Sequence, residues 1–404
     1  MDAEDLADRV LAGEIRLHEL ESAADGDAAL AAAARRAVVR RETAVDPDAI
    51  GDFGFDPADA DSNIENLIGA AQVPMGVAGP VPIDGEHATR DRYLPLATTE
   101  GALVASVNRG CAVIRESAGA TARVLERGMT RAPAFRVADV TEAAAVADWV
   151  RANGDRLAAV AEETTSHGEC TGVRPYVVGD TVFCRFAYDT KDAMGMNMAT
   201  IATRAAAEEI EAETPASLVA LSGNLCVDKK PAAINAVEGR GRTVAADVLV
   251  PRAVVEERLH TTPEAIAEVN RRKTMVGSAK AVSLGFNAQV ANVVAALFLA
   301  TGQDAAQVVE GANGITTAEA RDEGLYASLT LASLEVGTVG GGTRLPTQAE
   351  ALDLLGVRGG GDPAGANGDA FAEAVAVGAL AGELSLHAAL ASRHLSSAHE
   401  ELGR

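Results

Sequence analysis

Lysine is scarce in this chain of 404 residues, and so is positive charge in general. Acidic residues number 58 against 35 basic ones, which gives a formal net charge of -23. Nucleic acids and anionic membranes need a basic surface, so this charge argues against both as partners. At about 1 M salt the Debye length is only about 3 Å, and a strongly acidic surface is then tolerable. The composition therefore predicts adaptation to a salt-rich cell, although GC-rich coding is an alternative cause of the lysine shortage.

Aromatic residues and cysteines are also few. Aromatics make up 3% of the chain although hydrophobic residues make up 48%, so the core must be built from Ala, Val, Leu and Ile. The four cysteines show no CxxC spacing, which predicts buried free thiols in an intracellular enzyme. They are Cys111, Cys170, Cys184 and Cys226. A chain of this length can form two or three domains.

The sequence shows no sign of a secretion signal or a membrane span. Its start, MDAEDLADRV, lacks the basic and apolar blocks of a signal peptide. The longest apolar stretch, around residues 288–300, contains Asn292 and is too short to cross a bilayer. We therefore expect a soluble cytoplasmic protein without a membrane partner.

The patterning predicts an α+β protein in three parts. Residues 1–64 form a small helical region that packs on something larger. Residues 65–131 and 222–404 form a large helix-rich domain, and residues 132–221 are inserted into it. The insertion is expected to contain a strand, a helix, two strands, a helix and a strand, at 135–137, 141–152, 173–178, 181–188, 192–214 and 217–221. This βαββαβ order is that of a ferredoxin-like domain.

Glu100 lies on the apolar stripe of a helix expected to run from Thr98 to Ser117. A first-turn glutamate favoured by the helix dipole is one interpretation. The other is a desolvated carboxyl group with a raised pKa that acts as a general acid.

The stretch from Ser222 to Asn235, SGNLCVDKKPAAIN, is more specific. It places the adjacent pair Lys229 and Lys230 beside Asp228 in a chain that otherwise avoids lysine. A solvated surface pair is the usual explanation for two lysines, but the shortage elsewhere favours chemistry. A lysine ammonium is a compact charge suited to an oxyanion that develops on a carbonyl.

Three other features are ambiguous by spacing alone. Asp192-Ala-Met-Gly-Met-Asn197 opens a helix, where free N–H groups can hold a phosphate or simply follow an N-cap. Asp304 follows an apolar helix and could be a cap. His399, near the chain end, could be an exposed histidine or part of a terminal flap. The sequence Gly359-x-Gly361-x-x-Ala364 is a poor dinucleotide fingerprint because it contains Pro363.

Taken together, these segments resemble 3-hydroxy-3-methylglutaryl-CoA (HMG-CoA) reductases of the biosynthetic class, in a form expected of a halophilic archaeon. The resemblance covers residues 65–400. It is carried by ENLIG at 65–69, PMGVAGP at 74–80, TEGALVAS at 99–106, NRGC at 108–111, GMTR at 128–131, DAMGMN at 192–197, the 222–235 stretch, VGSA at 276–279, GQDAAQ at 302–307, EVGTVGGGT at 335–343 and GELSL at 382–386.

The resemblance implies reduction of (S)-HMG-CoA to (R)-mevalonate and CoA with two NADPH, the committed step of isoprenoid synthesis. Lys229 would hold the oxyanion, and Asp304 would tune Lys229 and Glu100 by charge. Glu100 would donate a proton in the aldehyde step, and His399 would protonate the departing CoA thiolate. The family also implies a homodimer or homotetramer whose active sites lie between subunits.

The remaining assignments carried over from the family concern binding, and no metal is expected. The acyl group would meet Arg131, Ser222, Asn224, Asp228, Lys230, Lys273 and Asn292. CoA would meet Glu65, Asn66, Ser106 and Arg109. The NADPH cofactor would meet Asp192, Met194, Gly195, Met196, Asn197, Gly340, Gly341, Gly342 and Thr343.

One departure and two alternatives stay open. The segment Ser166-His-Gly-Glu169 occupies the place where relatives carry an arginine for the 2′-phosphate, so the preference for NADPH over NADH is implied by the family alone. The alternatives are NAD-dependent degradative oxidation of mevalonate and a non-catalytic CoA-binding relative.

Overall fold

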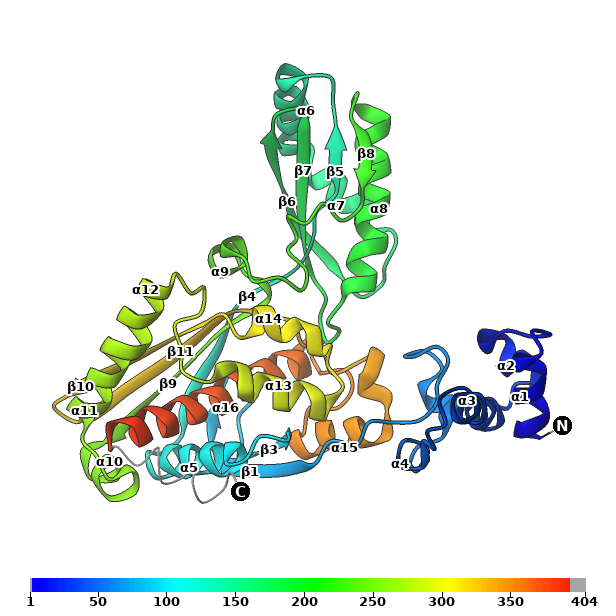
Figure 1. The fold of residues 1–404 in the computed structure, drawn as a ribbon. Helices are drawn as coiled ribbons and strands as arrows, with labels where there is room; N and C mark the ends of the chain where they lie inside the picture. The colour runs from blue at the N-terminus through cyan, green and yellow to red at the C-terminus, as the bar shows by residue number, and fades with distance from the viewer. Residues whose placement is uncertain (1, 393–404) are drawn as a thin grey trace.

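The computed structural model describes residues 2–392, and residues 1 and 393–404 lie outside this description. Figure 1 shows a large body, an inserted domain that projects from it, and a group of N-terminal helices to one side. This α+β arrangement with an inserted ferredoxin-like domain is the predicted one. The predicted boundaries of the three parts remain a prediction.

The N-terminal region is entirely helical among its described residues. Its elements are α1 (Ala3–Leu11), η1 (Leu17–Glu19), α2 (Leu20–Ala23), α3 (Ala28–Thr43), α4 (Asp48–Gly51) and η2 (Pro57–Ala60). Helix α1 begins after Asp2 because the side chains of Asp2 and Asp5 cap each other's backbone N–H groups. Leu6 and Leu20 belong to a small separate core.

The expected packing of this region on something larger is not seen within the described residues of one chain, and it stays a prediction. Figure 1 shows the helices standing apart from the large body. Two arginines of α3 bond to the linker that follows this region: Arg36 Nη1 donates to the Ile68 carbonyl at 2.8 Å, and Arg35 Nη1 to that of Leu67 at 3.4 Å. Apolar residues of α1, α2 and α3 pack against one another in two small clusters.

The large body is built on an antiparallel sheet with the strand order β10–β11–β9–β4. The bounds of its strands are Gly314–Arg321 (β10), Gly324–Leu334 (β11), Arg240–Pro251 (β9) and Ala120–Arg131 (β4), with the short β2 (Ile83–Asp84) parallel to the start of β4. A second, two-stranded sheet pairs β1 (Met75–Val81) with β3 (Arg92–Ala97).

Helices surround these sheets. They are α5 (Leu103–Glu116), α9 (Ala233–Glu238), α10 (Arg252–Leu259), α11 (Pro263–Val269), the π-helix η3 (Asn270–Gly277), α12 (Ser278–Ala281), α13 (Val290–Thr301), η4 (Ala305–Gln307), α14 (Val308–Gly311), η5 (Gly341–Arg344), α15 (Pro346–Leu355) and α16 (Ala366–Ala391). The main core contains many Ala, Val and Leu residues and few aromatics, as the composition predicts.

The sequence-based estimate of the longest apolar segment is wrong. Helix α16, not the stretch at 288–300, is the longest apolar element among the described residues, and its length and composition would allow it to cross a membrane. In the structure 78% of its most apolar window is buried, and it packs against α5, α13 and the sheet. It therefore forms the central helix of the core here.

The inserted domain has the ferredoxin-like topology. Its elements are β5 (Ala134–Arg136), α6 (Val140–Ala152), α7 (Gly154–Glu162), β6 (Glu169–Val178), β7 (Thr181–Asp189), α8 (Met196–Glu213) and β8 (Ser217–Ala220). All pairs in the order β8–β5–β7–β6 are antiparallel. The additional helix α7 was not expected. Strand β4 joins the two sheets, because residues 121–128 pair with β9 and 129–131 pair with β7.

All four cysteines are free and buried, which confirms their predicted state. Burial raises the pKa of the Cys111 and Cys184 thiols to about 12. Thiols that ionise this reluctantly are poor nucleophiles, so these two cysteines serve packing.

Candidate active site

The loop that follows β8 has an unusual backbone. Asn224, Val227 and Lys229 all have positive φ, at 63°, 48° and 59°. Such values are uncommon outside glycine, and for a β-branched residue such as Val227 they are strained. The surrounding structure holds this conformation: the side chain of Asn235 donates to the Val227 carbonyl at 3.1 Å, and Thr130 Oγ1 donates to that of Cys226 at 3.1 Å. Local strain of this kind is typical of functional sites.

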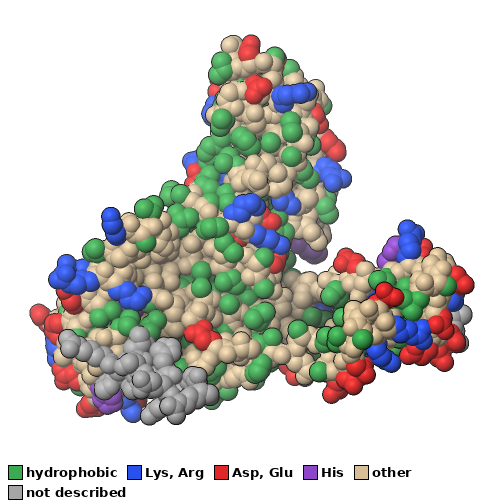
Figure 2. Space-filling view, viewed as in Figure 1, with side chains coloured by type: hydrophobic (Ala, Val, Ile, Leu, Met, Phe, Trp, Pro, Cys, Tyr) green, Lys and Arg blue, Asp and Glu red, His purple; other side chains and the backbone are tan. Residues whose placement is uncertain are grey.

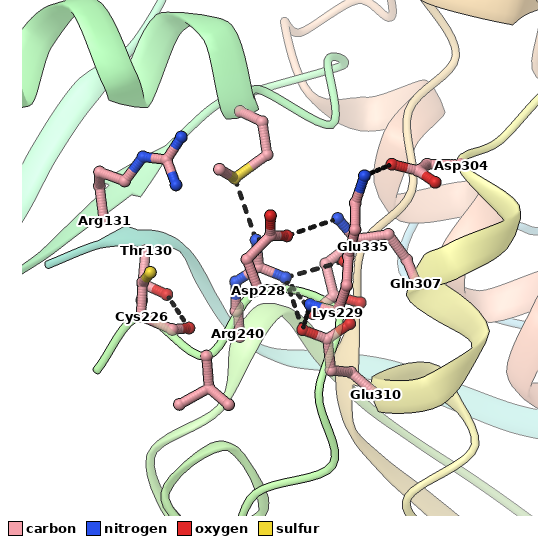
Figure 3. A network of polar contacts seen from close by, with 12 residues as sticks. Thr130, Arg131, Cys226, Asp228, Lys229, Arg240, Asp304, Gln307, Glu310 and Glu335 are labelled. Carbon is pink, nitrogen blue, oxygen red and sulfur yellow. Dashed lines mark hydrogen bonds and ion pairs between the residues drawn. The ribbon is translucent and has the colours of Figure 1, made fainter. Parts of the chain in front are cut away.

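The strained loop presents Lys229 to Asp304 (Figure 3). Lys229 Nζ lies 2.7 Å from Asp304 Oδ2. The hydrogen bond that Lys229 donates to Asp304 is the main cause that raises the pKa of Lys229, so its ammonium stays charged at neutral pH. The other oxygen of Asp304 accepts the N–H of Ala306 and so caps η4. The predicted capping role is therefore confirmed, and the contact with Lys229 leaves the catalytic role of Asp304 as a prediction.

Behind Lys229 lies a buried guanidinium, that of Arg240 at the start of β9. Arg240 is 1% exposed. Its Nη2 donates to Asp228 Oδ1 at 2.9 Å, and its Nη1 contacts Glu310 Oε1 at 3.0 Å and Glu335 Oε1 at 3.1 Å. Glu310 Oε1 also accepts the backbone N–H of Lys229 at 2.8 Å. Figure 3 shows Arg240 at the centre of these side chains, which come from separate segments of the chain.

The sequence analysis did not identify Arg240, Glu310 or Glu335 as site residues. An arginine that opens a strand looks like any surface arginine in the sequence. The one local signal was Glu310 itself, because it follows Val308 and Val309 and precedes Gly311, a setting of apolar and small residues.

Glu100 is exposed, so its predicted burial on a helical stripe is wrong. The helix starts later than expected: Ala102 has φ of 68°, and α5 begins at Leu103. Glu100 therefore precedes the helix. Its Oε1 accepts a hydrogen bond from Asn292 Nδ2 at 3.1 Å, which brings two of the predicted site residues together.

The Glu100–Asn292 pair and the Lys229–Asp304 pair lie at opposite ends of α13. Asn292 is in its first turn, and Asp304 follows its end. From Asn292 to Thr301 there are nine steps of 1.5 Å, or about 14 Å along the helix. Among the described residues, the predicted site residues therefore form one pair at each end of α13.

The other predicted acyl-group contacts are spread between the loop and its surroundings. Arg131 Nη2 donates to Thr200 Oγ1 of α8 at 2.8 Å, and Figure 3 draws Arg131 beside the Arg240 network. Lys230 Nζ donates to the Asp228 carbonyl at 3.0 Å. Ser222 lies 3.5 Å from Cys226 Sγ, in the same loop as Asn224. Lys273 is exposed on η3, which lies about 40 residues after this loop in the sequence.

The two segments predicted to hold the cofactor lie together. Ala193 and Val339 form an isolated parallel bridge, and the N–H of Thr338 donates to the Asp192 carbonyl at 2.8 Å. The side chain of Gln303 bonds both the N–H and the carbonyl of Gly337, each at 2.9 Å. Because Gln303 precedes Asp304, the structure joins the predicted cofactor segments to the Lys229–Asp304 pair.

The predicted helix start at Asp192 is wrong, because α8 begins at Met196 after Gly195 with φ of 89°. Asp192 is buried instead. Its carboxylate accepts the N–H groups of Gly361 and Gly368 at 2.9 Å and of Gly365 at 2.7 Å. The three bonds therefore fix the glycine-rich loop before α16 and the first turn of that helix against Asp192, at the start of the predicted cofactor segment.

We expect Asp192→Ala to lower the free energy of unfolding by about 1–3 kcal/mol, because three buried N–H groups lose their acceptor. Chemical denaturation in high salt measures the loss. Asp192→Asn retains one acceptor oxygen and should lose less. Equal stability of Asp192→Ala and the parent would contradict this account.

The predicted CoA contacts fall in two places. Ser106 Oγ lies 2.9 Å from Ser385 Oγ, and Arg109 Nε donates to the same hydroxyl at 3.0 Å, so both α5 residues meet α16. Glu65 and Asn66 are exposed in the linker before β1. His399 lies outside the described residues.

Comparison with known proteins identifies the family. The model of the hydroxymethylglutaryl-coenzyme A reductase family matches residues 31–404, which extends the resemblance toward the N-terminus. The chain is 70% identical over 403 residues to the 3-hydroxy-3-methylglutaryl-coenzyme A reductase of Haloferax volcanii, with 100% of both chains covered. It is 71% identical over 404 residues to that of Halobacterium salinarum, with 100% of this chain and 99% of the relative covered.

A solved structure shows the same fold. It is the class II 3-hydroxy-3-methylglutaryl-CoA reductase from Streptococcus pneumoniae bound to NADPH in open conformations, with a TM-score of 0.67 and 20% identity. The match covers 82% of this chain and 89% of the solved one. On the family match and the two halophilic relatives, the chain belongs to the hydroxymethylglutaryl-coenzyme A reductase family.

Proposed function

We propose that this chain reduces (S)-HMG-CoA to (R)-mevalonate and CoA with two NADPH, in the cytoplasm of a halophilic archaeon, as the committed step of isoprenoid lipid synthesis. The observation that carries the proposal is the Lys229–Asp304 ion pair of 2.7 Å, presented by a strained loop within a chain of this family. A charged lysine at such a place suits an oxyanion on a thioester or aldehyde carbonyl.

The residues assigned to the cofactor fit a dinucleotide. Helix α8 is 18 residues long, and its N-cap Gly195 provides no side-chain cap, so N–H groups of the first turn are available to a phosphate. A Cβ on Gly195 would lie 2.2 Å from a side-chain atom of Thr190, so this position requires glycine. The bound NADPH would supply hydride.

The chain's own residues divide the remaining work. Lys229 stabilises the negative oxygen in both reductions, and Asp304 keeps it charged. Glu100, oriented by Asn292, donates a proton to the aldehyde oxygen. His399 protonates the CoA thiolate, which makes it a better leaving group and stops it from attacking the aldehyde. Arg131, Lys230 and Lys273 bind the acyl carboxylate.

We further propose a homodimer, or a homotetramer formed by two dimers, with active sites between subunits. The placement of the two pairs at opposite ends of α13 supports it, because the Glu100–Asn292 pair of one subunit could face the Lys229–Asp304 pair of another. Figure 2 shows hydrophobic and uncharged side chains over much of the large body on this face, which suits burial against a second copy.

The test is the loss of NADPH absorbance with HMG-CoA at multimolar KCl, with mevalonate identified as the product. Measuring NADPH and NADH in both directions separates the proposal from degradative oxidation, which would favour NAD and mevalonate. Binding of HMG-CoA without any turnover would indicate the non-catalytic relative and contradict the proposal.

A further inference from the structure

Two carboxyl groups behind the Lys229 loop lack enough hydrogen-bond donors. Arg240 Nη1 carries two hydrogens but contacts three acceptors: Gln307 Oε1 at 2.8 Å, Glu310 Oε1 at 3.0 Å and Glu335 Oε1 at 3.1 Å. The second oxygens of Glu310 and Glu335 are buried and have no partner. A buried carboxylate oxygen without a donor is costly when charged, and protonation removes that charge.

The two carboxyl groups are also close to each other. Because their Oε1 atoms contact the same nitrogen, these atoms are at most about 6 Å apart, a range at which like charges disfavour joint ionisation. Burial raises the pKa of Glu310 to about 7 and that of Glu335 well above its usual range. Arg240 opposes both shifts.

The surrounding charges give this pair a function. Glu310 of α14 is faced by Arg240 of β9, by Glu335 after β11, and by Asp228, Lys229 and Lys230 of the loop; Asp304 pairs with Lys229. If all were ionised, four carboxylates would face three cations. A negative site would repel an anionic acyl group and oppose an oxyanion, whereas one or two protons make it neutral or positive.

We propose that the carboxyl groups of Glu310 and Glu335 together hold a proton behind Lys229, and we call this pair the proton store. Tight binding of an anionic acyl thioester then requires Glu310 to be protonated. Glu310 is then a positioning residue, because it touches the backbone N–H of Lys229 and Arg240 rather than the reacting atoms. The inference rests on the proposed function.

Glu310→Gln provides the main test. The amide oxygen can still accept from Lys229 N and Arg240 Nη1, while the side chain imitates the protonated state. In the parent, KM for HMG-CoA should rise above pH 7, by up to about tenfold per pH unit as one proton is lost. The variant should show a flat KM from pH 6.5 to 8.5. Glu350→Gln, an exposed change on α15, serves as the matched control and should follow the parent.

A second measurement does not depend on turnover. The raised pKa means that the folded state binds the Glu310 proton more tightly than the unfolded chain, whose carboxyl has a pKa near 4.5. The contribution of this proton to the free energy of unfolding is fully present below pH 4.5 and is lost as the pH rises through about 7. The free energy of unfolding of Glu310→Gln, taken relative to that of the parent, should therefore be higher at pH 8 than at pH 5.

The outcomes separate the two proposals. Absence of turnover at every pH would contradict the proposed function and leave the stability experiment to test the proton store. The requirement for a proton would be overturned if the KM of the parent stayed constant from pH 6.5 to 8.5. It would also be overturned if the KM of Glu310→Gln changed with pH as it does in the parent. Equal pH dependence of unfolding in the parent and Glu310→Gln would overturn the proton store itself.

Discussion

Lys229→Ala should lower kcat by about 10²–10³-fold or more, because it removes the positive charge that meets the developing oxyanion. Its contact with Asp304 at 2.7 Å fixes the ammonium in place, and the exposed setting of the side chain means that its loss leaves no cavity. We expect folding to be nearly unaffected. Steady-state NADPH oxidation at multimolar KCl, together with HMG-CoA binding by calorimetry, measures the two effects separately.

Lys280→Ala is the matched control for this prediction. Lys280 is also exposed, lies on α12, and is not among the proposed site residues, so the same change of charge should leave kcat near the parent value. Lys229→Arg keeps a charge but replaces the compact ammonium with a planar group, and we expect only partial activity. Full activity of Lys229→Ala would refute the role of this lysine in catalysis.

The second large effect is expected from Arg240→Leu, which should lower the free energy of unfolding by about 3–5 kcal/mol. The arginine is 1% exposed and is the shared partner of three carboxyl groups. Removing it leaves the buried Glu310 and Glu335 and the half-buried Asp228 without their cation, so these groups must bind protons or draw in water. Chemical denaturation at constant KCl gives the loss.

Two comparisons sharpen this result. Arg252→Leu breaks a surface pair with Glu264 and should cost about 0–1 kcal/mol. Arg240→Leu combined with Glu335→Gln should recover part of the loss, because a neutral amide replaces one of the carboxyl groups left without a cation. If Arg240→Leu were no more destabilising than Arg252→Leu, the buried network would not contribute to stability as we describe.

Some of the site could be predicted because it is local. The stretch around Lys229 combines two lysines, an aspartate and a proline within a few residues, and the scarcity of lysine made the pair conspicuous. Asp304 was predicted only through the resemblance of its segment to the family, because its place after an apolar helix fitted a cap equally well. The βαββαβ order also follows from local periodicity, because each strand and helix there buries one face against its own small core.

The two errors about helix starts have different physical causes. Spacing placed Glu100 on a buried helical stripe, but the left-handed backbone at Ala102 delays the helix, and a pattern of side chains does not reveal that turn. Asp192 was expected to open a helix, yet its carboxylate accepts three N–H groups from the glycine-rich loop and the first turn of α16, about 170 residues away. A long-range contact thus overrides local preference at Asp192.

The sequence by itself determined the composition of the core, the inserted domain and the lysine pair, because these depend on residues close together in the chain. Only the tertiary structure decided what surrounds that pair. Arg240, Glu310 and Glu335 come from three separated segments. Their charges interact strongly only when folding removes them from water and places the two carboxyl groups beside the Arg240 guanidinium. The energy of a buried charge depends on its neighbours in space, which the order of residues does not specify.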